Sequence, residues 1–179
     1  MTADERHYLD QLLAKLDDLD PIVRRDAAMD LGDFCPKNHP AVNVLIERLR
    51  SPQQTLPDRA CAALALGRIG AKAFEVIPIL LTLIEEMKDQ ADADALRLFA
   101  AEAIEKLTGE MDVLLPVACR CLADRFWKCR VSGLSLAERL LKRQPEVSHR
   151  LVPLLEPLVN DEVDEIRENA VRLLVEFEE

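Results

Sequence analysis

The chain has 179 residues and a formal net charge of −10, and 49% of its residues are apolar while only 4% are aromatic. This length suits one globular domain or one short repeat array, and the acidic balance argues against general nucleic-acid binding, which depends on neutralising phosphates. No uncharged apolar run of about 18 residues occurs and the first residues lack the pattern of a secretory signal, so we expect no membrane contact and a cytoplasmic protein.

Ten helices are predicted, and they follow one another in pairs. The pairs are expected at 4–17 with 21–34, 40–50 with 57–69, 72–88 with 92–107, 110–123 with 126–142, and 147–159 with 162–178. Thr2 followed by Glu5 has the spacing of a capping box. Asp20 before Pro21 is a typical helix start, and Gly70 is a typical helix end.

Prolines recur inside the first helices of the last three pairs, at Pro78, Pro116 and Pro153. Proline removes one backbone donor and crowds the preceding turn. We therefore expect these helices to be bent or interrupted at matching points.

One pattern recurs along the whole chain. In the segment 57–70 it is Arg59-x-x-Ala62-Ala63-x-x-Leu66, and aligned copies give an arginine ladder at Arg24, Arg59, Arg97, Arg130 and Arg167. The spacings between these arginines are 35, 38, 33 and 37 residues. Five copies at a nearly constant period predict a stacked repeat.

The predicted fold is all-α: a right-handed α-solenoid (α-α superhelix) of five helix pairs in a single domain over residues 1–179. The repeats are expected at about 1–35, 36–70, 71–108, 109–143 and 144–179. The arginines have buried-face spacing, so we expect the ladder to be structural and not a phosphate-binding stripe.

The helix pairs, the prolines, the arginine ladder and the Asp-Pro-x-Val-Arg-x-x-Ala segment from Asp20 to Ala27 together resemble the HEAT-repeat family. The segments Val23–Gly32 and Asp58–Gly70 are similar to the short HEAT-like repeats of the phycobilisome-lyase type. The resemblance covers essentially the full chain. It implies the fold strongly and the function weakly.

In HEAT repeats this arginine usually bonds an aspartate and loop carbonyls at the turn between the helices. An aspartate stands six residues before three of the arginines here, at Asp18, Asp124 and Asp161. Gln53 and Ala91 occupy that position in the second and third repeats. The resemblance therefore implies an Asp–Arg ladder that is broken in the middle of the chain.

Catalytic and metal-binding patterns are nearly absent from the sequence. The three histidines lie in different repeats, and the five cysteines follow no metal-finger or disulfide spacing. No glycine-rich phosphate loop and no Gly-x-Ser-x-Gly motif occurs. We expect no catalytic residue, no metal, no cofactor and no enzymatic activity.

Trp127 is the single tryptophan, and Arg125, Phe126, Lys128 and Arg130 surround it in the sequence. It could be an aromatic anchor in a basic patch or a base-stacking residue. The favoured interpretation is a large side chain that seals the junction of the fourth and fifth repeats.

In a solenoid of this kind the second helices usually line the concave face. The outward positions on these helices predict a polar strip with two apolar members, which suits a protein or peptide partner, although an ordinary solvated face stays an equal alternative. The strip consists of Asp26, Met29, Asp33, Arg68, Phe99, Glu102, Lys106, Ser132, Ser135 and Arg139.

The expected function is a non-catalytic scaffold or adaptor that binds a protein or peptide partner on this concave face. A bilin-lyase-like, chromophore-handling protein is the first alternative. A HEAT-like nucleic-acid-binding protein that uses the basic residues of segment 111–150 is the second.

Overall fold

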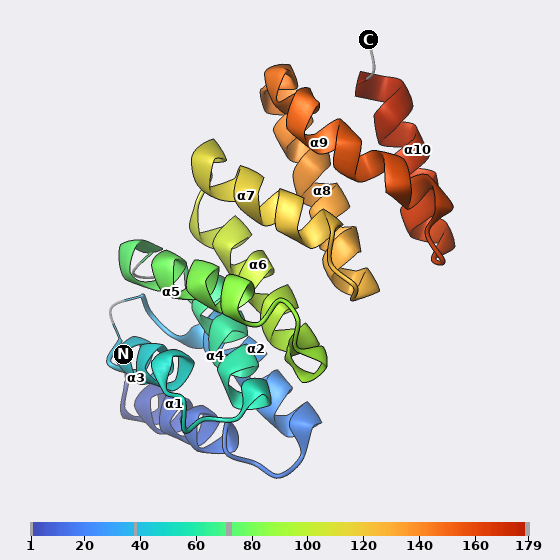
Figure 1. Ribbon diagram of the computed structural model, residues 1–179. Helices are drawn as coiled ribbons and strands as arrows, with labels where there is room; N and C mark the ends of the chain where they lie inside the picture. Colours follow the sequence, from blue (N-terminus) through green and yellow to red (C-terminus); the bar gives the residue numbers. More distant parts are fainter. Residues whose placement is uncertain (1, 38, 71–72, 178–179) are drawn as a thin grey trace. The chain divides into compact units, whose positions relative to one another are not determined.

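The computed structural model describes residues 2–37, 39–70 and 73–177. Within them the chain forms ten α-helices and no strand, so the all-α prediction is confirmed (Figure 1). The helices are α1 Ala3–Lys15, α2 Pro21–Phe34, α3 Ala41–Arg50, α4 Leu56–Ile69, α5 Ala73–Glu86, α6 Asp94–Leu107, α7 Met111–Leu122, α8 Trp127–Arg143, α9 Ser148–Leu155 and α10 Asp164–Phe177. Short 3₁₀ helices are η1 Ala91–Ala93, η2 Pro145–Val147 and η3 Glu156–Asn160.

The helices pack in sequential pairs, as HEAT-type solenoids do. The predicted starts and ends differ from these bounds by one or two residues at most helix termini. The helix predicted at 147–159 is instead α9 followed by η3, and the residues before Asp94 form η1. The start predicted at Lys72 and the end predicted at Glu178 lie outside the described residues.

Three helix ends show the predicted chemistry. The Thr2 hydroxyl accepts a hydrogen bond from the Glu5 backbone N–H at 3.2 Å, and the Glu5 carboxylate accepts one from the Thr2 N–H at 2.7 Å. The Asp20 carboxylate accepts from the Ile22 N–H at 2.8 Å. Gly70 ends α4 with φ 67°, in the left-handed region where a side chain would be strained.

Two compact units make up the chain, Met1–Leu107 and Thr108–Glu179. The prediction of one domain over residues 1–179 stays a prediction. No α-helix among the described residues is both long and apolar enough to cross a membrane.

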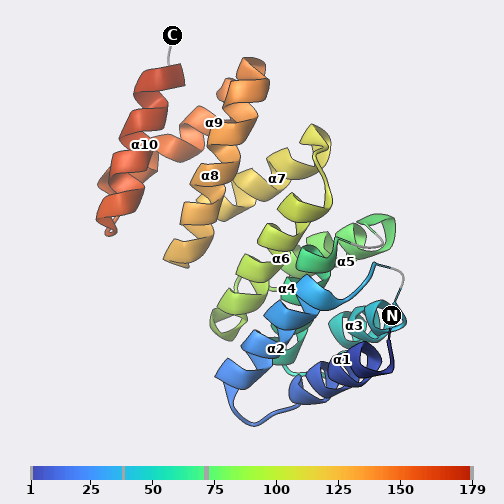
Figure 2. The same cartoon turned by 180° about the vertical axis from the view of Figure 1, so that it is seen from behind.

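In the unit of residues 1–107, the second helices α2, α4 and α6 form one close-packed row, which Figures 1 and 2 show from opposite sides. Gly67 of α4 lies so near α6 that a Cβ atom there would be 2.6 Å from the Cα atom of Ala103. Ala63 and Leu66 beside it are fully buried. Small side chains thus allow the close approach of successive second helices.

In the unit of residues 108–179, α7 packs on α8 and on α9, and α8 packs on α10. Gly133 occupies the place of the first alanine in the repeat pattern. A Cβ atom there would be 2.7 Å from the backbone nitrogen of Leu122 in α7. The change from alanine to glycine therefore lets α8 approach its own first helix closely.

The prolines of the first helices are all exposed. α5 and α7 continue as α-helices through Pro78 and Pro116. α9 ends at Leu155, two residues after Pro153, and the chain continues as η3. Of the three prolines, only Pro153 of the fifth pair is followed by an interruption of its helix, and a second proline, Pro157, lies in the 3₁₀ segment after it.

Glu138 of α8 holds an ion-pair network that joins α8 to α10. Arg172 of α10 donates to its carboxylate at 2.8 Å, and Lys142 donates at 2.5 Å. These hydrogen bonds, with Arg172 the larger contributor, lower the pKa of Glu138 from 4.5 to about 2.

We expect the Glu138→Gln variant to be less stable than the wild type by about 0.5–1 kcal/mol at neutral pH, because solvent screens this surface network. A carboxylate whose pKa is lowered by folding stabilises the protein above its unfolded-state pKa and loses this effect as pH falls through its folded-state pKa. The difference in unfolding free energy should therefore shrink as pH falls from about 4.5 toward 2. Urea unfolding across this range measures it, with the exposed Glu168→Gln as control; a difference that stays constant with pH would contradict the prediction.

Candidate partner-binding surface

The arginines of the ladder close the turns between paired helices, and three of them do so in the same way. Arg24, Arg130 and Arg167 each donate from Nη1 to the backbone carbonyl of the residue six positions earlier, at 2.8, 3.1 and 2.6 Å. Those residues are Asp18, Asp124 and Asp161. Each arginine thus bonds the carbonyl of the predicted aspartate across the turn.

The carboxylates of these aspartates have another task at the same turn. Each accepts a hydrogen bond from the backbone N–H two residues later, at 2.9 Å for Asp18, 2.8 Å for Asp124 and 3.0 Å for Asp161. Asp18 and Asp124 thus give their backbone carbonyls to the arginine of their own repeat and use their carboxylates to shape the turn. The aspartate carboxylate stabilises the turn from within, and the arginine stabilises it by a hydrogen bond from the second helix.

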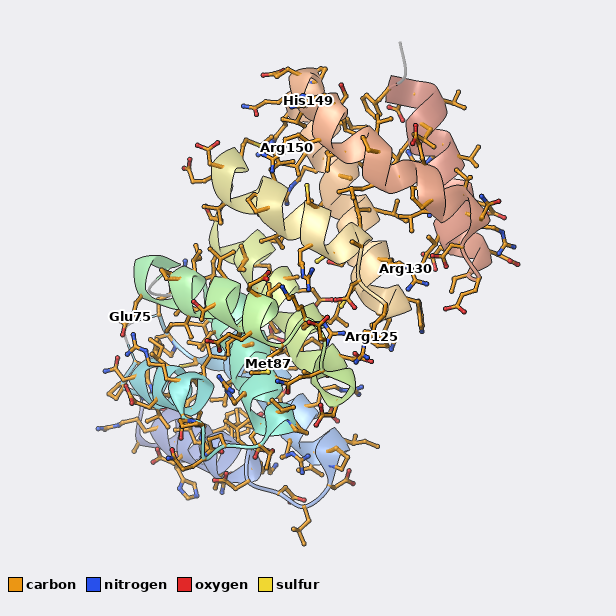
Figure 3. The ribbon with its side chains drawn as sticks, in the orientation of Figure 1. Glu75, Met87, Arg125, Arg130, His149 and Arg150 are labelled. Carbon is orange, nitrogen blue, oxygen red and sulfur yellow. The ribbon has the colours of Figure 1, made fainter. Side chains whose placement is uncertain are left out.

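The carboxylate that faces the arginine comes from the next repeat. Arg24 Nε lies 3.3 Å from an oxygen of Asp58. Arg130, labelled in Figure 3 beside the turn that holds Arg125, donates to both oxygens of Asp161 at 2.7 and 2.9 Å. Burial of the Asp161 carboxyl acts to raise its pKa, but the hydrogen bonds from Arg130 and the Val163 backbone bring the pKa below its usual value.

The two middle arginines use other groups. Arg59 Nε donates to the Leu49 carbonyl at 2.9 Å. Arg97, only 2% exposed, donates to the carbonyls of Met87 and Gln90 at 3.1 and 2.7 Å and to Asp94 at 2.6 Å. All five arginines therefore bond groups of the chain itself.

A hollow of about 260 Å³ lies at the N-terminal ends of α2, α4 and α6. We call it the second-helix hollow. Its lining is mostly apolar and comes from three successive repeats: Pro21, Ile22, Arg24, Arg25, Pro57, Ala60, Cys61, Ala95 and Phe99. Among the predicted strip residues, Phe99 belongs to it, half-buried.

Ile22 is the most conspicuous member that the sequence prediction missed, since 59% of its surface is exposed. Ile22, Pro57 and Ala95 each stand two residues before the ladder arginine of their repeat. An apolar residue at one aligned position in three repeats is a signal that could have found the hollow.

The other predicted strip residues of this unit lie outside the hollow lining and are partly engaged with one another. Asp33 forms an ion pair with Arg68, and Asp26 lies 3.4 Å from Arg25. Burial raises the pKa of Glu102. Met29 and Lys106 are exposed.

Three strip residues and Trp127 belong to the unit of residues 108–179. Ser135 is exposed, whereas Ser132 and Arg139 are half-buried. Trp127 is 39% exposed, with the Lys128 ammonium 5.5 Å from its ring centroid and Phe126 at 6.4 Å. Trp127 is therefore partly exposed and lies next to a cation, and its role stays a prediction.

Comparison with protein families gives two matches. A model of HEAT repeats matches residues 9–95, and a model of a single HEAT repeat matches residues 151–179. No curated protein matches the chain in sequence.

Proposed function

Because this chain is a HEAT-repeat protein, we propose that it is a non-catalytic scaffold that binds a partner protein or peptide in the second-helix hollow. HEAT-repeat proteins commonly act as protein-interaction scaffolds. The observation that carries the proposal is an apolar hollow built by three successive repeats, at matching positions of their second helices. Repeat proteins bind extended partners along surfaces of this kind, which successive repeats build from matching positions.

The energetic argument rests on Ile22 and Phe99. Complete burial of a fully exposed isoleucine or phenylalanine side chain contributes about 1.5–3 kcal/mol. Ile22, 59% exposed, and the half-buried Phe99 can each contribute a part of this to a complex. Interfaces place such anchors at their centre and charged groups at their rim. Arg25 is exposed at this rim and can contact polar groups of the partner.

The test compares three baits in an affinity pull-down from a lysate of the source cells: the wild type, Ile22→Asp/Phe99→Ala, and Val44→Asp. Val44 is an exposed aliphatic residue on α3, outside the hollow, so it is a matched control. We expect one protein to be retained by the wild type and by Val44→Asp and to be lost with the double variant. Circular dichroism melting of all three baits checks that they are folded.

Other outcomes would redirect the assignment. Partners retained equally by all three baits would contradict binding in the second-helix hollow. A visible-absorbing chromophore on the eluted wild type would favour the bilin-lyase-like alternative. Nucleic acid in the eluate, lost at high salt, would favour the nucleic-acid alternative.

A further inference from the structure

A second hollow, of about 270 Å³, lies at the opposite end of α2. It is lined by Glu5, Tyr8, Leu9, Phe34 and Pro36, and we call it the Tyr8–Phe34 hollow. The second-helix hollow includes Pro21, the first residue of α2, whereas Phe34 is its last residue. At 1.5 Å per residue the two positions are about 20 Å apart, so the two hollows are separate sites.

Phe34 is exposed, whereas the residue at the same position is buried in the second and fourth repeats and half-buried in the third and fifth. It stands ten residues after its ladder arginine, as Ile69 and Leu140 do. Phe34 is 62% exposed, whereas Ile69 is 4% exposed and Leu140 is fully buried. Together with Tyr8, which is 38% exposed, it places an unusual amount of aromatic surface in water.

The two rings meet nearly at a right angle. Their centroids are 5.8 Å apart and their planes differ by 82°. The Tyr8 hydroxyl donates to the Asp30 carboxylate at 3.3 Å, which fixes the ring in place. Aromatic faces carry partial negative charge and attract cations that lie within about 6 Å.

Acidic groups surround these rings. Glu5 is a lining residue of the hollow, and its carboxylate accepts a hydrogen bond from the Thr2 N–H at 2.7 Å. The carboxylate of Glu5 and that of Asp30, which bonds the Tyr8 hydroxyl, therefore favour a cation here over a neutral or an anionic group.

The size of the hollow limits the occupant further. Pockets that bury a drug-sized ligand usually measure about 300–1,000 Å³, and this hollow lies below that range. It suits a single side chain presented by another protein. We propose that the Tyr8–Phe34 hollow binds the cationic side chain of a lysine on a partner protein.

The experiment is an NMR titration of the full chain with three small probes: N-acetyl-lysine amide, its trimethylammonium analogue, and the uncharged N-acetyl-norleucine amide. Tyr8 is the single tyrosine of the chain, so its ring signals are unambiguous. We expect both cationic probes to shift the Tyr8 and Phe34 ring signals saturably, and norleucine amide to bind at least about fivefold more weakly.

The decisive variant is Tyr8→Leu/Phe34→Leu, which keeps apolar side chains at both positions and removes the aromatic faces. We expect affinity for the cationic probes, read from backbone amide shifts around the hollow, to fall about two- to fivefold for each ring removed. Leu19→Ala, at an exposed loop position of the same unit, should leave the affinity unchanged. Thermal melting shows that each variant is folded.

Two outcomes would overturn the proposal. Equal binding of norleucine amide and lysine amide would show a merely apolar site. Self-association of the wild type that is lost in the double variant would assign the hollow to a second copy of the chain.

Discussion

Replacing Arg97 with methionine is expected to lower the free energy of unfolding of the residue 1–107 unit by about 2–4 kcal/mol. The Arg97 side chain is buried and donates to two backbone carbonyls, of Met87 and Gln90, and to the Asp94 carboxylate. Methionine fills much of the same space but donates no hydrogen bond. The variant therefore loses three charge-assisted hydrogen bonds that close the turn between α5 and α6.

Arg167→Met is the matched control because it changes the same position of another repeat. The Arg167 side chain is half-buried and its Asp164 partner is largely exposed, so we expect a smaller loss, of about 1 kcal/mol. Hydrogen exchange of the α6 amides measures the loss of stability in Arg97→Met, and exchange of the α10 amides measures the loss in Arg167→Met. Equal losses in the two would contradict the view that burial makes the middle of the ladder stronger.

Replacing Leu66 with alanine is expected to cost about 2–5 kcal/mol of unfolding free energy. Leu66 is fully buried in α4, the helix that packs against α2, α3 and α6. Truncation removes apolar contacts and leaves a cavity that the close-packed helices cannot fill, because Gly67 already brings α4 and α6 into backbone contact.

Urea unfolding followed by circular dichroism measures this loss, with exchange of the α4 amides to localise it. Trp127 is the single tryptophan and lies in the other unit, so its fluorescence serves as an internal reference. Val44→Ala, at an exposed position of α3, should change stability by less than about 0.5 kcal/mol. If Leu66→Ala lowered the free energy of unfolding by no more than Val44→Ala does, the assignment of Leu66 to the core would be contradicted.

The arginine ladder shows which structural features the sequence pattern predicts and which it does not. Its period and its buried-face spacing identified the five arginines and predicted a structural role. The family resemblance implied bonds to the aspartate six residues earlier and to loop carbonyls. At Arg24 and Arg130 that aspartate contributes its backbone carbonyl, and a carboxylate of the next repeat also lies beside the arginine. Periodicity along one chain does not specify which repeat supplies a partner, because that depends on how neighbouring pairs stack.

The candidate sites were less accessible to sequence reasoning. Phe99 was predicted from the outward positions of the second helices, but Ile22 was not, because it stands at the start of a helix where apolar periodicity is weak. Tyr8 and Phe34 come from different helices of the first pair. Their ring contact depends on the packing of α1 against α2 and leaves no signature in the sequence.

The sequence by itself determined the all-α class, the sequential helix pairs and most helix bounds, because these follow from local capping, helical periodicity and a repeating core pattern. Only the tertiary structure decided which apolar side chains stay in contact with water, which carboxylate faces each arginine, and where hollows form between helices. Those features depend on distances between residues far apart in the chain, and such distances are fixed by packing rather than by local preference.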